Sequence, residues 1–443
     1  MNLTAPLIAQ SDLEILVEVD NPDYVAARDA ISPFTELVKS PEHVHTYRIS
    51  HLSLWNAASV GLDSEEVLER LRQWSKGMRR CGKSVLMELY ADELRQSGVP
   101  EEDIVFINLE KFEYQGIRSS AQLNDLLYRR INPEHLTYVL LDEIQDVDGW
   151  EMSLSALNAA GNCDVYITGS NSDLLSSQLA THISGRHIEI EVFPLSFSEF
   201  MEMHGYDDRE SAFNAYLEYG GLPGVDPSRD RRYIQDYLQG VYSTVVVKDV
   251  LRHVNVSDPT KVEAIARFLY ANIGNLTSKA SVAEGTGIPE STVAIYMRAM
   301  EEAFLIYPCD RYDIVGKRLL STNGKYYVPD LGLRKAVLNI TAGTDISKPL
   351  ENVVYLELLR RGYDVRVGCY RDSEVDFLAV KQDSMEYIQV CQTLLSEKTK
   401  DREIKPLQRP KDNFSKTILT LDRFGLGNEN GIVIRNVLDW LTE

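Results

Sequence analysis

The sequence predicts an α/β protein in which a parallel sheet is followed by a mainly helical region and then by a second module of mixed helices and strands. Between residues 104 and 193, apolar runs without polar alternation are separated by helical segments, which is typical of parallel strands covered on both faces. Residues 230–306 have helical periodicity throughout. From residue 350 onward, helical and strand-like segments mix again.

The expected elements follow from these patterns in chain order. Near the start we expect a strand at 14–20, a helix at 23–38 and two short helices within 51–71. A helix from Ser84 to about Ser97 comes next, before strands at 104–109, 138–143, 165–170 and 188–193. The remaining expectations are a helix at 196–218, a boundary at 219–225 (YGGLPGV), strands within 310–328, a helix from Leu350, and strands at 376–380, 386–392 and 416–422.

Length and composition limit the classes of function. The chain has 443 residues, 44% of them hydrophobic, which is enough for about two to four domains with real cores. A formal net charge of −21 disfavours non-specific binding along nucleic acid, so any DNA contact has to be local. The five cysteines are dispersed without a C-x-x-C pair, which predicts reduced thiols and a cytoplasmic protein. We find neither a signal peptide pattern nor a run of about 18 apolar residues, so no membrane contact is expected.

A phosphate-binding loop is indicated by the stretch GMRRCGKS, which fits the pattern G-x-x-x-x-G-K-S from Gly77 to Ser84. Its glycines let backbone N–H groups turn toward phosphate oxygens, Lys83 reaches the β- and γ-phosphates, and Ser84 ligates Mg²⁺. The residues expected to bind the nucleotide are Gly77, Arg80, Cys81, Gly82, Lys83, Ser84 and Val85.

The apolar run at residues 138–143 ends in two acids, Asp142 and Glu143. The carboxyl end of a buried strand lies at the ligand crevice of an open α/β sheet. Asp142 is therefore expected to hold the water shell of Mg²⁺, and Glu143 to polarise the attacking water. The alternative is a strand that simply ends on solvated acids.

Small polar side chains end the run VYITGSNSDLL. Asn171 or Ser170 is placed to touch the γ-phosphate or the lytic water, although the same residues would make a helix-capping turn equally well. Arg186, before the expected strand at 188–193, is a candidate for stabilising charge in the same subunit or in a neighbour. A solvated arginine is the alternative for Arg186.

These motifs in this order, together with SGRHIEIEVFPLSFSEF and YGGLPGV, resemble the prokaryotic AAA-type ATPases that carry a C-terminal nuclease-like domain. The resemblance covers residues 77–443. It implies an ATPase that uses ATP and Mg²⁺, with Lys83, Ser84, Asp142 and Glu143 in the roles given above and Asn171 as the sensor. Arg186 matches a family arginine whose role stays open.

Residues 6–75 resemble a different family, the N-terminal accessory domain of bacterial and archaeal XPB-type DNA repair helicases. None of the helicase motor motifs follows, so helicase activity is not expected. The chain changes family between Leu71 and Gly77, and we interpret it as a fusion. A central strand normally precedes a phosphate-binding loop, but the apolar residues at this place have helical spacing: Val67, Leu68, Leu71 and Trp74. The first strand of the sheet is therefore expected to be missing.

The middle region has helix-turn-helix spacing at residues 279–305, followed by a strand-like stretch that would form a wing. The second helix offers one base, Arg298, beside Glu290, Glu301 and Glu302. Such a surface would bind phosphate poorly, so we favour a winged helix that serves as a spacer or contacts protein over one that contacts DNA.

The C-terminal residues resemble the PD-(D/E)XK nuclease fold, whose sites combine a helix acid, a strand-end Asp and an E-x-K on the next strand. Glu351 and Asp376 stand where the two acids belong. Gln389-Val390-Cys391 replaces E-x-K, so we expect no metal-dependent cleavage, and the two acids then read as ordinary surface acids.

The predicted organisation is an XPB-like domain (1–76), an AAA-type core (77–225), a helical and winged-helix region (226–345) and an inactive nuclease-like domain (346–443). The predicted function is Mg²⁺-dependent ATP hydrolysis coupled to rearrangement of the C-terminal modules. The alternative is a non-catalytic interaction protein with a damaged ATPase core. Besides ATP, the expected partner is another protein or a second copy of the chain, with DNA contact as a further alternative.

Overall fold

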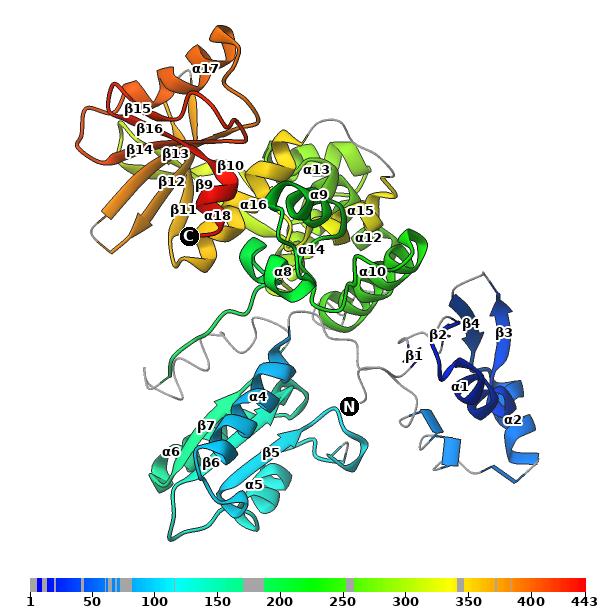
Figure 1. The fold of residues 1–443 in the computed structure, drawn as a ribbon. Coiled ribbons are helices and arrows are strands. Elements are labelled where there is room, and N and C mark those ends of the chain that lie inside the picture. The colour runs from blue at the N-terminus through cyan, green and yellow to red at the C-terminus, as the bar shows by residue number, and fades with distance from the viewer. Residues whose placement is uncertain are drawn as a thin grey trace.

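The structure, a computed structural model, describes residues 6–9, 14–19, 21–40, 44–59, 61–62, 66–67, 70–71, 82–114, 116–169, 187–251, 259–340, 346–370, 373–382 and 384–443. Among these residues, no helix is both long enough and apolar enough to cross a bilayer. The described residues form an N-terminal sheet, a parallel three-stranded sheet with helices, and a C-terminal body built on a nine-stranded sheet (Figure 1).

The N-terminal unit is an antiparallel sheet in the order β1-β2-β4-β3, packed on α1 by a small core that includes Ile15, Val17 and Phe34. Its elements are β1 (Leu7–Ala9), β2 (Glu14–Glu18), α1 (Tyr24–Ile31), β3 (Glu36–Lys39), β4 (Val44–Arg48) and α2 (His51–Ser59). The single helix expected at 23–38 was wrong. Helix α1 ends at Ile31 because Pro33 cannot continue the helical hydrogen bonds, and β3 follows after one short turn.

The second unit is a parallel sheet in the order β5-β6-β7, with helices on both faces. Along β6, Leu140 packs with α4 on one face, whereas Val139 and Leu141 belong to the core under α5 and α6 on the other. This explains the unbroken apolar runs in the sequence. The elements are α4 (Lys83–Gln96), β5 (Ile104–Asn108), α5 (Ser120–Tyr128), β6 (Thr137–Asp142), α6 (Trp150–Ala160) and β7 (Cys163–Ile167).

The strand expected at 188–193 is not formed. Residues 187–193 pair with no strand of the described chain, and the side chains of Ile188 and Ile190 are 91% and 75% exposed. Strand β7 pairs with β6 along one edge, and no described strand covers its other edge. The expected absence of the strand before the phosphate-binding loop concerns residues 72–81, which lie outside the described residues.

The C-terminal body begins with helices that enclose a large apolar core. They are α8 (Phe197–His204), α9 (Arg209–Tyr219), α10 (Arg231–Val245), a π-helical turn (Val246–Leu251), α12 (Pro259–Ala271), α13 (Lys279–Thr286) and α14 (Glu290–Glu302). Within residues 230–251 and 259–306, the all-helical expectation missed the two-residue strand β8 (Leu276–Thr277). The expected strands within 310–328 are confirmed as β9 (Tyr307–Asp313) and β10 (Arg318–Tyr327).

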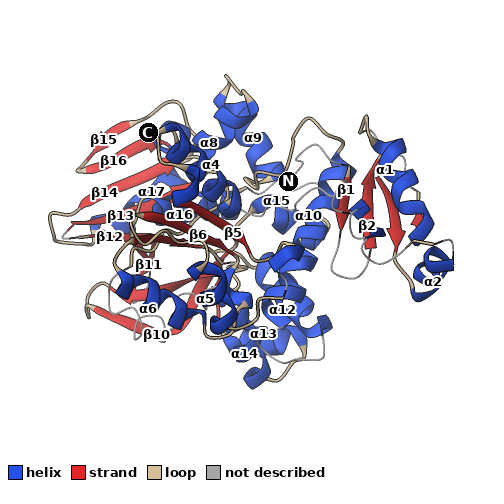
Figure 2. Cartoon of the chain, turned by 90° about the horizontal axis from the view of Figure 1, so that it is seen from below, coloured by secondary structure: helices blue, strands red, loops and turns tan. Residues whose placement is uncertain are grey.

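The remaining elements complete a mixed sheet in the order β15-β16-β14-β13-β12-β11-β9-β10-β8. Figure 2 shows β15, β16, β14, β13, β12, β11 and β10 following one another in this order. They are α15 (Leu331–Leu338), α16 (Ser347–Arg360), β11 (Asp364–Cys369), β12 (Glu374–Lys381), β13 (Ser384–Cys391), α17 (Glu397–Gln408), β14 (Ser415–Thr420), β15 (Gly427–Glu429), β16 (Ile432–Asn436) and α18 (Val437–Leu441). Strand β11 pairs with β9, so the sheet joins the helical region to the C-terminal strands.

Candidate nucleotide-binding site

The phosphate-binding motif ends at the start of helix α4. Gly82 has a φ of 88° and caps the helix, and Lys83 and Ser84 form its first turn. A Cβ at Gly82 would meet no atom within 4 Å, so the left-handed backbone, and not crowding, is what favours glycine there. Lys83, Ser84 and Val85 thus sit at a helix N-terminus, where backbone N–H groups favour anions.

Helix α4 is held against the sheet by Met87, Ala91 and Leu94, which pack on Ile104 of β5 and Leu140 of β6. This packing brings the start of α4 to the carboxyl ends of the parallel strands. The charge of Lys83 acts on Glu143, which follows β6 directly. The start of α4 and the acids that the sequence assigns to one site therefore lie at the same edge of the sheet, with Lys83 in electrostatic range of Glu143.

Asp142, the last residue of β6, is fully buried, and hydrogen bonds hold both of its carboxylate oxygens. The side-chain amide of Asn108, at the end of β5, donates to Asp142 Oδ2 at 2.6 Å. The hydroxyl of Thr168, just after β7, donates to Asp142 Oδ1. The ends of three adjacent strands therefore fix one carboxylate, which excludes the alternative of a solvated acid.

Glu143 takes a left-handed backbone conformation with a φ of 59°, which is uncommon for a residue other than glycine and is typical of functional sites. Its N–H donates to Thr168 Oγ1 at 3.2 Å, and its carboxylate accepts from Gln145 Nε2 at 2.5 Å. Burial raises the pKa of Glu143 and the carboxylate of Glu110 raises it further, whereas the Gln145 hydrogen bond and the charge of Lys83 lower it.

The described residues contain six of the predicted site residues, and the structure brings them together: Gly82, Lys83, Ser84, Val85, Asp142 and Glu143. The other five lie outside the described residues: Gly77, Arg80, Cys81, Asn171 and Arg186. The sequence reasoning missed Asn108, Glu110 and Thr168. Asn108 and Thr168 are polar residues at the ends of apolar runs, the same signal that marked Asp142, and would have been found by applying it to every run.

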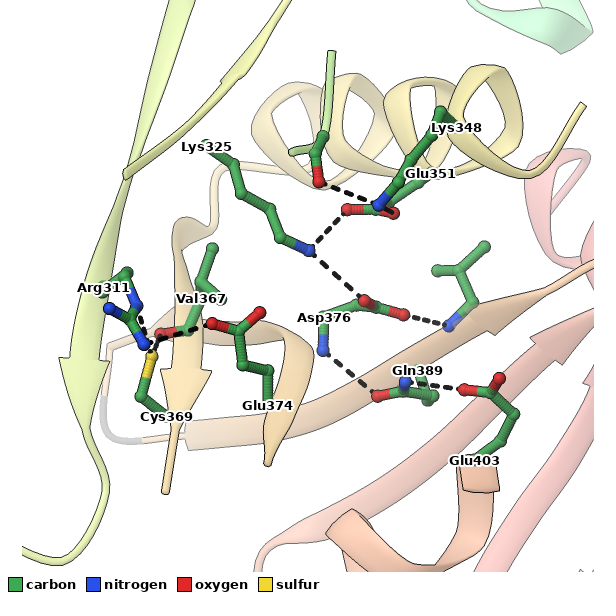
Figure 3. A network of polar contacts seen from close by, with 12 residues as sticks. Arg311, Lys325, Lys348, Glu351, Val367, Cys369, Glu374, Asp376, Gln389 and Glu403 are labelled. Carbon is green, nitrogen blue, oxygen red and sulfur yellow. Dashed lines mark hydrogen bonds and ion pairs between the residues drawn. The ribbon is translucent and has the colours of Figure 1, made fainter. Parts of the chain in front are cut away.

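A second polar cluster lies in the C-terminal body, around the two acids expected from the nuclease resemblance (Figure 3). Glu351 is 4% exposed and contacts Lys325, which also contacts Asp376. The expectation that Glu351 and Asp376 are ordinary surface acids was wrong. Packing of α16 and β12 against β10 buries Glu351 and leaves the Asp376 side chain 16% exposed, and a lysine from a distant part of the sequence pairs with both acids.

Comparison with known families divides the chain into three matching segments. Residues 74–201 match an AAA domain, residues 210–344 match a domain of unknown function, and residues 7–79 match a helicase conserved C-terminal domain. A DNA 3'-5' helicase XPB of Mycobacterium tuberculosis is 55% identical over 71 residues, which is 16% of this chain and 13% of the helicase.

Two relatives of unknown function match most of the chain. An uncharacterised protein of Methanocaldococcus jannaschii is 28% identical over 377 residues, covering 79% of this chain and 82% of the relative. An uncharacterised protein of Haemophilus influenzae is 37% identical over 377 residues, covering 83% of this chain and 93% of the relative. The chain therefore belongs to the family of this Haemophilus influenzae protein and carries an AAA domain behind an XPB-like helicase segment.

Proposed function

We propose that this protein is an ATPase that binds ATP with Mg²⁺ between the start of α4 and the carboxyl ends of β5, β6 and β7. The observation that carries the proposal is the convergence of Lys83, Asp142 and Glu143 at this edge of the sheet. An ammonium at a helix N-terminus beside a fixed, buried carboxylate is the arrangement that a nucleotide with a hard cation requires.

Mg²⁺ prefers oxygen ligands and usually keeps several of its waters. The Ser84 hydroxyl would therefore bind the ion directly, and the Asp142 carboxylate, whose oxygens already accept hydrogen bonds, would act through the bound waters. When bound, Mg²⁺ would neutralise charge on the β- and γ-phosphates. Lys83 binds the same phosphates as a cation. Asp142 holds the water shell of the ion, and its orientation is set by Asn108 and Thr168.

Glu143 is the proposed general base for the attacking water. A base works best when its pKa lies near the working pH, and burial moves the pKa of Glu143 in that direction. Thr168 positions the base as well, because its hydroxyl oxygen accepts the N–H of Glu143. The further roles proposed from the sequence are a backbone cradle from Gly77, Arg80, Cys81 and Val85, a sensor at Asn171 and charge stabilisation by Arg186.

Coupling to the C-terminal modules is proposed through the segment that leaves the ATPase core. Arg360, on α16, donates hydrogen bonds to the carbonyl oxygens of Pro194 and Leu195 at 3.1 and 3.3 Å. Helix α16 also carries Glu351. A shift of residues 187–195 that accompanies nucleotide turnover would therefore act directly on the helix that carries the C-terminal polar cluster.

The C-terminal modules are proposed to be a winged helix and a nuclease-like domain. Helices α13 and α14 followed by the hairpin β9–β10 support the first, and the succession α16-β11-β12-β13-α17-β14 supports the second. Arg298 of α14 pairs with Glu302 at 2.8 Å, so the one base of this helix is already neutralised. We therefore keep protein contact, and not DNA contact, as the role of the winged helix.

A second candidate function is a non-catalytic interaction protein, favoured by the exposed side chains of Ile188 and Ile190 and by an edge of β7 that no strand of the described residues covers. Steady-state phosphate release with Glu143→Gln separates the two functions. An ATPase loses turnover in this variant but retains ATP binding, and the matched control Lys398→Ala, at an exposed lysine of α17, keeps both. Absence of phosphate release by the wild type with Mg²⁺ would reject the catalytic function.

A further inference from the structure

The polar cluster at the C-terminal body, here called the Lys325 cluster, consists of Lys325, Tyr327, Lys348, Glu351 and Asp376. Lys325 and Tyr327 come from β10, Lys348 and Glu351 from α16, and Asp376 from β12. The Lys325 side chain is 4% exposed and lies between the two carboxylates (Figure 3). It contacts Glu351 Oε1 at 2.8 Å and Asp376 Oδ1 at 3.4 Å.

Every carboxylate oxygen of the Lys325 cluster accepts a hydrogen bond from the protein. Glu351 Oε1 accepts from Lys325 and from the Tyr327 hydroxyl at 2.6 Å, and Glu351 Oε2 accepts from Lys348 at 2.8 Å. Asp376 Oδ1 accepts from Lys325, and Asp376 Oδ2 accepts from the backbone N–H of Val390 at 3.0 Å. A metal ion would have to displace these donors from a buried site.

The charges of the Lys325 cluster already balance, because two ammonium groups face two carboxylates. Burial opposes the charged form of Glu351, but Lys325 and Lys348 hold its pKa below the ordinary value. Burial raises the pKa of Asp376 to about 6, and the charge of Glu351 adds to this rise, while Lys325 opposes it. A divalent cation added to these balanced charges would leave a net positive charge in a largely buried site, which is costly.

Gln389 and Cys391, which stand at the third ligand position of a nuclease-like centre, are also unsuited to bind a metal ion. Gln389 Oε1 accepts the N–H of Asp376 at 3.1 Å, and Gln389 Nε2 donates to Glu403 Oε2 at 2.7 Å. Burial raises the pKa of Cys391 to about 12, so its sulfur is a thiol and not the thiolate that binds metals. Among the residues that the structure describes, no three His, Cys, Asp or Glu side chains are arranged to hold a metal ion.

These residues do not fit the metal ions that the nuclease resemblance implies. We infer that the ammonium of Lys325 stands in the place of a metal ion between Glu351 and Asp376, as a cation supplied by the chain itself. The cluster then ties β10 to α16 and β12 and takes no divalent ion. This inference does not depend on the proposed ATPase function, because it concerns different residues of a different sheet.

Removing the internal cation should open the site to an external one. In the full chain, Lys325→Met deletes the charge and keeps most of the side-chain volume. We expect Lys325→Met to bind one Mn²⁺ in calorimetry without nucleotide, and its unfolding temperature to rise with Mn²⁺. The double variant Lys325→Met/Asp376→Asn should show neither effect. When Lys325 is retained, we expect no Mn²⁺ binding and no rise of the unfolding temperature with Mn²⁺, with or without Asp376→Asn. Mn²⁺ binding by the wild type that Asp376→Asn removes would overturn the inference, as would a folded Lys325→Met protein without Mn²⁺ binding.

A second measurement covers the case in which Lys325→Met alone fails to fold. Glu351→Gln should lower the unfolding temperature of the wild type, because it leaves the buried Lys325 with less compensating charge. In the Lys325→Met background the same change should raise the unfolding temperature, or restore folding where Lys325→Met alone does not fold, because only the ammonium of Lys348 then faces two carboxylates and the change removes the excess negative charge. An effect of Glu351→Gln with the same sign in both backgrounds contradicts the role of Lys325.

Discussion

The Thr168 hydroxyl donates a hydrogen bond to the carboxylate of Asp142 across the carboxyl ends of β7 and β6. The same hydroxyl oxygen accepts the backbone N–H of Glu143 at 3.2 Å. One side chain thus orients the proposed Mg²⁺-holding acid and the proposed base together. The two strands lie side by side in the sheet, so the contact is set by their parallel register.

Replacing Thr168 should affect turnover more than binding. Thr168→Val keeps the shape but removes the hydroxyl, so Asp142 and Glu143 lose their common partner. We expect ATP hydrolysis to fall by about 10- to 100-fold, the effect of a barrier higher by roughly 1.4–2.7 kcal/mol, with a smaller change in ATP affinity. Thr168→Ser restores the hydroxyl and should restore most of the rate. Equal rates for the valine and serine variants would show that the hydroxyl does not position the acids.

Asn108→Asp should make the stability of the protein depend on pH. The change places a second carboxylate within hydrogen-bonding distance of the buried Asp142, and two such groups cannot both ionise easily, so one pKa rises. A raised carboxyl pKa contributes stability at low pH that is lost as the pH rises through it. Urea unfolding should therefore show Asn108→Asp closer to the wild type at pH 5 than at pH 8. Asn108→Ala, as control, should differ from the wild type by the same amount at both pH values.

Asp330 provides a pH prediction for the C-terminal body. This buried acid caps α15, accepting the N–H of Leu333 at 2.7 Å and the N–H of Gly221 at 2.6 Å. Burial raises its pKa from 3.8 to about 6, although these backbone hydrogen bonds oppose the rise. The protonated acid contributes to the free energy of unfolding below pH 4, and this contribution is lost as the pH rises through 6. The loss is about 3 kcal/mol at most.

Asp330→Asn keeps an acceptor for the cap and does not titrate. The free energy of unfolding of Asp330→Asn should therefore rise relative to the wild type between pH 4 and pH 7, as measured by urea unfolding at a series of pH values. A difference between the two proteins that stays constant over this range would mean that Asp330 does not titrate there.

A substitution at Gly332 tests whether α15 packs closely against the end of α9. A Cβ at Gly332 would lie 2.0 Å from the carbonyl oxygen of Tyr219, which is backbone and cannot move aside cheaply. Gly332→Ala should lower the free energy of unfolding by about 1–3 kcal/mol or more. Gly116→Ala, where a Cβ meets no atom within 4 Å, should stay within about 0.5 kcal/mol of the wild type. Similar values for both variants would argue against the packing at Gly332.

The sequence predicted the site residues that depend on local patterns. Lys83 and Asp142 belong to a loop motif and to a strand end, and both signals are readable over a few residues. Thr168 and Asn108 also end apolar runs, but their hydrogen bonds to Asp142 depend on which strands pair, and a pattern within one run does not contain that information. Lys325 is 26 residues from Glu351 and 51 residues from Asp376 in the chain, so a search for E-x-K on one strand could not find the lysine that tertiary packing supplies.

The strand expected at residues 188–193 failed for a similar reason. Alternating isoleucines give the segment strand propensity, but a strand forms only where another strand offers its backbone groups. The described part of the chain provides no such neighbour for these residues. Helix α1 shows the opposite case, since its early end at Ile31 follows from the adjacent Ser32-Pro33 and was readable in the sequence.

Binding of a nucleotide by the loop at the start of α4 is the property on which the proposed function depends. Calorimetric titration of ATP with Mg²⁺ into the full chain tests it, with Lys83→Ala as the comparison and Lys398→Ala as the matched control. We predict one binding site in the wild type and in Lys398→Ala, and an affinity lower by about 10- to 100-fold in Lys83→Ala, because a charged hydrogen bond to phosphate is lost. The absence of ATP binding by the wild type, or equal binding by Lys83→Ala, would contradict nucleotide binding by this loop.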